Sequence, residues 1–155
     1  MTPPPLAPFP PSRPHRIYVA APLPLLHDAR EAAAFLTKAG LTVTSSWHAL
    51  ADDPTPEKEH VMARAEQSRL ANTCLSEIDD SDALLLLVGP RSDRCGNVGE
   101  AFFAAGRGLH VFVLQHRADA VLPTILLTSD LFHKPTLIDL VVAMLSYVPL
   151  RTVRA

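Results

Sequence analysis

One segment of the chain combines residue types that could carry chemistry: a polar loop at 89–97 followed closely by a glutamate, Glu100. Gly96 and Gly99 precede this carboxylate, and the pattern predicts that Glu100 lies in the first turn of a helix. Because a helix dipole favours negative charge at its N-terminus, we expect Glu100 to stay ionised, which makes it a candidate nucleophile. Acidic residues also stabilise helix starts routinely, so the spacing alone leaves that purely structural role open.

The loops of the chain lack the common motifs for nucleotide cofactors and metals. GPRSDRCG lacks the Lys-Ser/Thr ending of a Walker A loop, and APLPLLH at 21–27 lacks GxGxxG, so neither an NTPase nor a dinucleotide-dependent oxidoreductase is supported. The seven histidines show no HExxH or paired ligand spacing. The acidic run Asp79, Asp80 and Asp82 favours a solvated turn over a magnesium site. We therefore expect no cofactor and no metal.

The segments around these loops alternate between short apolar runs and longer alanine-rich stretches, which is typical of a parallel α/β sheet. Strands are predicted at 16–20, 41–47, 83–88 and 110–114, with a short one near 130–132; helices are predicted at 28–38, 55–78, 98–107 and 135–147. In such sheets ligands bind outside the carboxyl ends of the strands. The loops at 21–27, 45–55 and 89–99 are therefore the candidates for a binding site.

Length and composition indicate one soluble globular domain. The 155 residues are 48% hydrophobic and 19% charged, with a formal net charge of −2. The sequence pI of about 6.4 gives no basic stripe, which disfavours a polynucleotide partner. The apolar runs are too short for a membrane helix, and prolines stand where a signal peptide would be apolar. Cys74 and Cys95 form no CxxC pair, and we expect a cytoplasmic protein without a membrane partner.

The N-terminal segment differs in composition from the rest of the chain. Its first fourteen residues contain seven of the fifteen prolines, which can neither pair into a sheet nor continue a helix. We predict a disordered proline-rich tail at 1–15 and an α/β domain at 16–155. Docking of this tail into an aromatic groove of a partner is the alternative.

Four runs of the chain together resemble a known superfamily. IYVAAP, LTVTSSW, SEIDDSDALLLLV and GNVGEAFFAAGRGLHVFVL are similar to segments of nucleoside 2-deoxyribosyltransferases, a superfamily that also contains nucleoside 5′-monophosphate N-glycosidases. The resemblance covers roughly residues 16–114, and LFHKPTLIDL resembles the phage and actinobacterial branch. With the alternating pattern, it implies a doubly wound, flavodoxin-like or Rossmann-like sheet in the strand order 2-1-3-4-5, with helices on both faces. It also implies a nucleoside or nucleotide as substrate and a homodimer or higher homo-oligomer.

The resemblance assigns roles to two residues. Glu100 matches the glutamate that attacks the anomeric carbon of the sugar, expels the base and forms a glycosyl-enzyme intermediate, which then passes to another base or to water. Tyr18 matches the tyrosine that hydrogen-bonds this nucleophile. The chemistry is reasonable, because a fixed anion beneath the anomeric carbon stabilises an oxocarbenium-like transition state and can then bond to it. Tyr18 could instead be an ordinary strand aromatic whose hydroxyl reaches solvent.

Two positions depart from the pattern of the superfamily. Cys74 stands where an aspartate is usual, and a neutral thiol cannot replace a carboxylate that orients the sugar or relays a proton. Glu77, three residues further along the same predicted helix face, is the candidate substitute. Phe102 stands where a glycine is usual and adds bulk. These departures motivate a second hypothesis, a catalytically impaired nucleotide-binding or sensor protein with the same fold.

The remaining candidate residues come from the three loops and the C-terminal region. Trp47 and His48 are predicted to end the second strand, where the indole could stack on a nucleobase or simply be a half-buried strand residue. A 5′-phosphate could bind to Ser92 and Arg94, and His133 and Lys134 could approach a ligand in a neighbouring subunit. The predicted substrate-binding residues are Ala21, Pro22, Trp47, His48, Cys74, Ser92, Arg94, Gly96, Asn97 and Gly99. The base, the sugar, the need for a phosphate and the choice between transfer and hydrolysis stay open.

Overall fold

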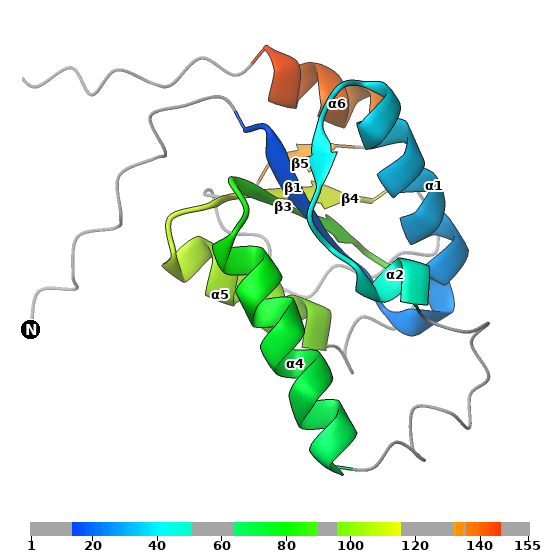
Figure 1. The fold of residues 1–155 in the computed structure, drawn as a ribbon. Coiled ribbons are helices and arrows are strands. Elements are labelled where there is room, and N and C mark those ends of the chain that lie inside the picture. Colours follow the sequence, from blue (N-terminus) through cyan, green and yellow to red (C-terminus); the bar gives the residue numbers. More distant parts are fainter. Residues whose placement is uncertain (1–13, 51–63, 90–95, 116–131, 135, 147–155) are drawn as a thin grey trace, which may run out of the picture.

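A computed structural model describes residues 14–50, 64–89, 96–115, 132–134 and 136–146, and every structural statement below concerns these residues. Five parallel strands form one sheet in the order β2-β1-β3-β4-β5 (Figure 1). The strands are β1 (Arg16–Ala20), β2 (Thr42–Val43), β3 (Ala83–Leu87), β4 (His110–Leu114) and β5 (Phe132–Lys134). The helices are η1 (Leu23–Leu25), α1 (Leu26–Lys38), α2 (Trp47–Leu50), α4 (Arg64–Asp79), α5 (Gly96–Gly106) and α6 (Leu137–Leu145). The predicted α/β class and strand order are confirmed.

Two hydrophobic layers, one on each face of the sheet, position the helices. Successive side chains of a strand point to opposite faces. Ile17 and Val19 therefore pack in the layer that contains α1 and α6, whereas Tyr18 and Ala20 pack in the layer that contains α4 and α5. Figure 1 shows these two pairs of helices on opposite sides of the sheet. β3 and β4 are buried along their whole length, as expected for central strands.

Two glycines end helices α1 and α5 where the sequence predicts helix stops. Gly40 and Gly108 have φ angles of 83° and 80°, in the left-handed region that glycine adopts without steric strain. The residue after each glycine donates its backbone N–H to a carbonyl five residues earlier, the bond typical of a Schellman motif. These stops direct the chain back into β2 and β4.

The predicted strand at 41–47 is wrong beyond Val43. Val19 in β1 explains why, because its backbone N–H donates to Ser45 Oγ at 3.1 Å and its carbonyl accepts from Trp47 Nε1 at 2.8 Å. Side chains thus take both backbone groups that a longer β2 would have paired. The chain leaves the sheet and forms α2 instead, so that Trp47 and His48 begin a helix rather than end a strand.

Other boundaries differ from the predictions by a few residues. α1 begins at Leu26 rather than 28, α5 begins at Gly96 rather than 98 and ends at Gly106, and β3 ends at Leu87. Of the predicted strand near 130–132, residue 132 begins β5 (Phe132–Lys134), and residues 130–131 lie outside the described residues. α6 is shorter than the predicted 135–147. α4 ends at Asp79, close to the predicted 78, whereas its predicted start at 55 lies outside the described residues.

Asp82 joins the N-terminal end of the fold to the start of β3. Its Oδ2 accepts the backbone N–H groups of His15 at 3.0 Å and Arg16 at 2.8 Å. Of the predicted tail at 1–15, residues 1–13 lie outside the described residues, while Pro14 is buried.

Asp79, in the same acidic run as Asp82, forms an ion pair with Arg107 of the turn after α5, with 3.1 Å between Asp79 Oδ1 and Arg107 Nε. Two members of the acidic run predicted as a solvated turn thus have structural partners.

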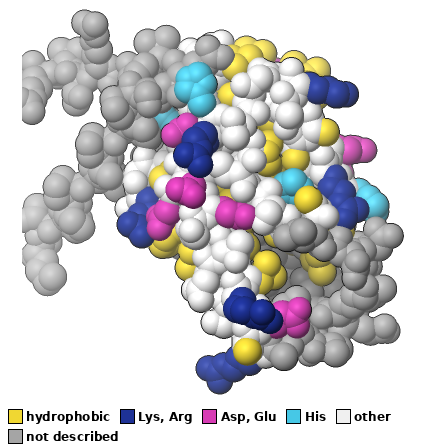
Figure 2. Space-filling view, in the orientation of Figure 1, with side chains coloured by type: hydrophobic (Ala, Val, Ile, Leu, Met, Phe, Trp, Pro, Cys, Tyr) yellow, Lys and Arg dark blue, Asp and Glu magenta, His cyan; other side chains and the backbone are white. Residues whose placement is uncertain are grey.

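In the view of Figure 2, acidic side chains gather near the centre with basic side chains beside them, rather than in a patch of one sign. No helix in the described part of the chain is long and apolar enough to cross a membrane.

We expect Asp82→Ala to lower the free energy of unfolding by about 1.5 kcal/mol, because two backbone N–H groups lose a charged acceptor. Urea denaturation at pH 7 measures the change. Asp80→Ala is the matched control, since Asp80 is an exposed neighbour and such substitutions usually stay within about 0.5 kcal/mol. Equal losses in the two variants would contradict the anchoring role of Asp82.

Candidate functional site

The candidate site is centred on a hydrogen bond between β1 and α5. Tyr18 Oη donates to Glu100 Oε1 at 3.1 Å. Tyr18 is fully buried and faces the α4 and α5 layer, while Glu100 is partly exposed. The structure thus brings together the two residues that the resemblance pairs, and the Tyr18 hydroxyl does not reach solvent.

Cys74 of α4 completes a cluster of three polar groups. It is 7% exposed, and its thiol lies close enough to the side chains of Tyr18 and Glu100 to influence the pKa of both. Burial raises the pKa of this thiol to about 11. At neutral pH Cys74 is therefore protonated, which makes it a weak hydrogen-bond donor to Glu100 and a poor nucleophile.

The sequence predicts that the start of α5 keeps Glu100 ionised, but the structure does not place Glu100 in the first turn of this helix. It is the fifth residue of the helix, beyond its first turn. Burial raises its pKa above the ordinary value; the hydrogen bonds from Tyr18 and Cys74 lower it, and the nearby charge of Glu77 raises it. Tyr18 has a pKa raised well above its usual range, by burial and then by the charge of Glu100, so it remains a donor. Burial and two donors, rather than the helix dipole, set the charge of Glu100.

Glu77 of α4 lies near the same cluster. Its Oε2 accepts the backbone N–H of Ser46 at 3.2 Å, and its Oε1 accepts the Ser46 hydroxyl. Its charge affects the pKa values of Glu100, Cys74 and His48. The carboxylate predicted as a substitute for the usual aspartate therefore lies close to the nucleophile candidate and is held by the loop after β2.

Trp47 and His48 fix α2 against the carboxyl end of β1. The Trp47 indole is held by Val19, is partly buried, and meets the His48 ring edge-on with centroids 5.7 Å apart. His48 is 8% exposed, its Nε2 is 3.1 Å from Ser45 Oγ, and burial lowers its pKa. Arg30 Nε donates to the His48 carbonyl at 2.8 Å. These contacts give both side chains a structural role at the edge of the site.

Ser45 and Ser46 are contributors that the sequence analysis missed. Ser45 shapes the end of β1, and Ser46 holds Glu77. The only available signal was a pair of hydroxyl residues directly after a predicted strand, in a loop at the carboxyl edge of the sheet.

The other predicted binding residues are spread around this edge. Ala21 and Pro22 follow β1 and are partly buried, and the Pro22 carbonyl accepts from Leu25 at the start of η1. Gly96 and Gly99 are exposed at the start of α5, whereas Asn97 is 6% exposed. Ser92 and Arg94 lie outside the described residues; His133 and Lys134 form part of β5. In the described ranges, no group of three ligating side chains is placed to hold a metal ion.

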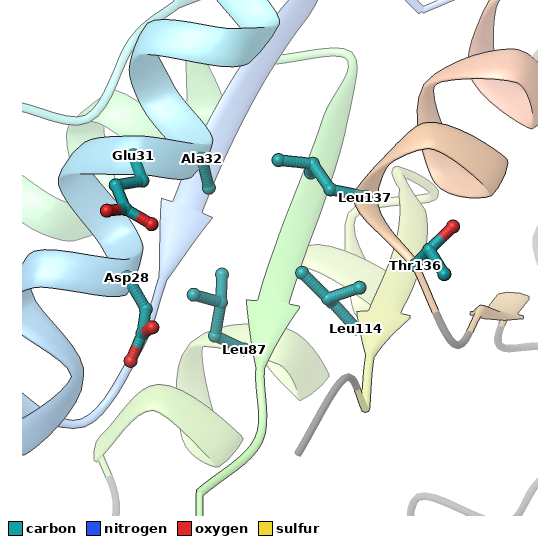
Figure 3. A pocket seen from close by; sticks show the side chains of 7 residues that line it. All are labelled: Asp28, Glu31, Ala32, Leu87, Leu114, Thr136 and Leu137. Carbon is teal, nitrogen blue, oxygen red and sulfur yellow. The ribbon is translucent and has the colours of Figure 1, made fainter.

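A cavity of about 310 Å³ lies on the opposite face of the sheet (Figure 3). It is lined by Asp28, Glu31, Ala32, Leu87, Leu114, Thr136 and Leu137. Leu87 and Leu114 come from the ends of β3 and β4, and the two carboxylates come from α1. None of the residues of the Tyr18–Glu100 cluster lines this cavity. We place the candidate site at that cluster because interacting titratable groups converge there.

Comparison with known proteins adds no independent assignment. No family model matches the chain, and no curated protein or solved structure matches it.

We expect Glu100→Gln to stabilise the protein increasingly as pH rises. The raised pKa of Glu100 means that the folded state holds its proton more tightly than the unfolded state. This contribution to stability is complete below the unfolded pKa, near 4.5, and is lost as pH rises through the folded pKa. Glutamine keeps an acceptor for Tyr18 without the buried charge. Urea denaturation of both proteins between pH 4 and about pH 8 measures the difference, and a difference that shrinks with rising pH would contradict the expectation.

Proposed function

We propose that the protein cleaves or transfers the N-glycosidic bond of a nucleoside or nucleoside 5′-monophosphate, with Glu100 as the nucleophile. The observation that carries the proposal is the partly buried hydrogen bond from Tyr18 to Glu100, with Glu77 close by. The resemblance to nucleoside 2-deoxyribosyltransferases supports it, because it pairs the same two residues. The position at the carboxyl edge of a doubly wound sheet also supports it.

In the first step the Glu100 carboxylate bonds to the anomeric carbon while the bond from that carbon to the base nitrogen breaks. The electron pair of the broken bond goes to the base, which takes up a proton as it leaves. Tyr18 and Cys74 donate to Glu100 and lower its pKa against the effect of burial. They also fix the carboxylate oxygen in place, so that little reorganisation is needed in the transition state.

In the second step a water molecule or an acceptor base attacks the anomeric carbon and releases Glu100. The attacking nucleophile loses a proton, and we assign its acceptance to Glu77, the second carboxylate whose charge acts on Glu100. The same residue can give that proton to the next departing base. Ser46 holds both Glu77 oxygens, which restricts the carboxylate to one orientation.

Cys74 is the specific observation in favour of a second candidate, a nucleotide-binding protein without turnover. Its thiol contacts both Tyr18 and Glu100 and is neutral at physiological pH, since burial raises its pKa to about 11. It cannot serve as the second carboxylate of a proton relay. If Glu77 does not act as the second carboxylate, the site binds its ligand without cleaving the N-glycosidic bond.

Base release from purified protein separates these two candidates. The substrates are ribo- and deoxyribonucleosides and their 5′-monophosphates, with and without an acceptor base, and the free base is measured by chromatography. We expect release by the wild type and by Glu66→Ala, a control at an exposed carboxylate of α4, but none by Glu100→Ala. The absence of release from every substrate, with a ligand-dependent rise in melting temperature, would favour the binding protein.

We expect Tyr18→Phe to lower the rate of base release by roughly 10- to 100-fold. A hydrogen bond to a charged group contributes roughly 1.5–3 kcal/mol, and about 1.4 kcal/mol corresponds to a factor of ten. Loss of the donor also raises the pKa of Glu100, so the acidic limb of the pH–rate profile should shift to higher pH. A slower enzyme with an unshifted acidic limb would contradict this role of Tyr18.

A further inference from the structure

Asn97 is a buried polar side chain that the protein itself does not satisfy. It is 6% exposed, and neither its Nδ2 nor its Oδ1 has a hydrogen-bond partner among the described residues. Buried side-chain amides almost always have partners, because leaving both groups unpaired is unfavourable. An unpaired amide beside a candidate site is therefore evidence for a ligand group that completes it.

The position of Asn97 relates it directly to Glu100. Asn97, Ala101 and Ala104 form the buried stripe of α5 that faces the sheet. Glu100 follows Asn97 by three residues, a spacing that makes two helical side chains neighbours. Side chains of a helix lean toward its N-terminus. The Asn97 amide therefore lies closer to the carboxyl edge of the sheet than the Glu100 carboxylate does. The substituents next to a ligand carbon held at Glu100 can therefore extend toward Asn97.

The chemistry of the amide selects the kind of group that it binds. Nδ2 can only donate a hydrogen bond and Oδ1 can only accept one. A phosphate dianion or a carbonyl supplies acceptors alone and would leave Oδ1 unpaired. Two adjacent hydroxyl groups satisfy both atoms, because one hydroxyl oxygen accepts from Nδ2 while the other hydroxyl donates to Oδ1.

We propose that Asn97 binds the 2′,3′-diol of a ribose and that the site therefore selects ribonucleosides over 2′-deoxyribonucleosides. The inference rests on the proposed function, since Glu100 at the anomeric carbon places C2′ next to the attacked atom. A 2′-deoxy sugar leaves one amide atom buried against a methylene group. Sites that hydrogen-bond a substrate hydroxyl reject analogues that lack it by large factors for this reason.

The test compares kcat/KM for base release from three nucleosides of the same base: the ribonucleoside, the 2′-deoxyribonucleoside and the 3′-deoxyribonucleoside. The wild type should prefer the ribonucleoside by at least roughly 100-fold over each deoxy analogue. Asn97→Leu, which has a similar shape, should reduce both preferences to less than roughly tenfold, mainly through slower reaction of the ribonucleoside. Leu70→Ala, at an exposed position of α4, is the control and should keep the wild-type preference.

A second measurement does not depend on catalysis. The ribonucleoside should raise the melting temperature of the wild type more than either deoxy analogue does, and Asn97→Leu should lose this difference. Without ligand, Asn97→Leu should melt at a higher temperature than the wild type, because it removes an unpaired buried amide. If leucine prevents folding, Asn97→Ala replaces it, since a shorter side chain creates no clash.

The outcomes separate the two proposals. Base release with equal efficiency from ribo- and 2′-deoxyribonucleosides overturns the role of Asn97 and leaves the proposed reaction standing. A ribose-selective shift in melting temperature without any base release supports Asn97 and overturns the reaction. Wild-type selectivity that persists in both Asn97 variants also overturns the role of Asn97.

Discussion

A carboxylate held beside a phenol at the edge of a hydrophobic layer is the interaction on which the candidate site depends. Burial makes the charge of Glu100 unfavourable, and the hydrogen bonds from Tyr18 and Cys74 offset part of that cost. These donors come from β1 and α4, whereas Glu100 comes from α5. The packing of α4 and α5 on one face of the sheet therefore determines how readily the Glu100 carboxylate takes up a proton. A loosening of that layer would change both its position and its affinity for protons.

Elements with strong local signals were predictable from the sequence, and elements set by distant contacts were not. β3 and β4 are continuous apolar runs, and Gly40 and Gly108 mark helix ends through their own conformational freedom. The end of β2 could not be predicted, because it depends on side chains that bind the backbone of a residue more than twenty positions away. Glu100 was singled out by its place after a polar loop, and its pairing with Tyr18 came from the resemblance. Ser46 matters only because α4 brings Glu77 to it. The charge balance of Glu100 likewise follows from burial, which local spacing does not encode.

Within the cluster, hydrogen bonding to Glu100 and a second negative charge come from different residues of α4, Cys74 and Glu77. The thiol supports Glu100 as a neutral donor, and its lack of charge avoids a second anion directly beside Glu100. The anion is displaced by one helical turn to Glu77, where Ser46 satisfies it. This arrangement reduces electrostatic repulsion within the cluster and lengthens the path of any proton that moves through it.

β2 contributes only two residues to the sheet, at its outer edge beside β1. A strand this short offers very few free backbone groups along that edge in the described part of the chain. Association of two molecules by extension of the sheet at β2 would gain little, since main-chain pairing is the source of its strength. The strand that ends early to form α2 thus also protects the edge of the sheet against aggregation.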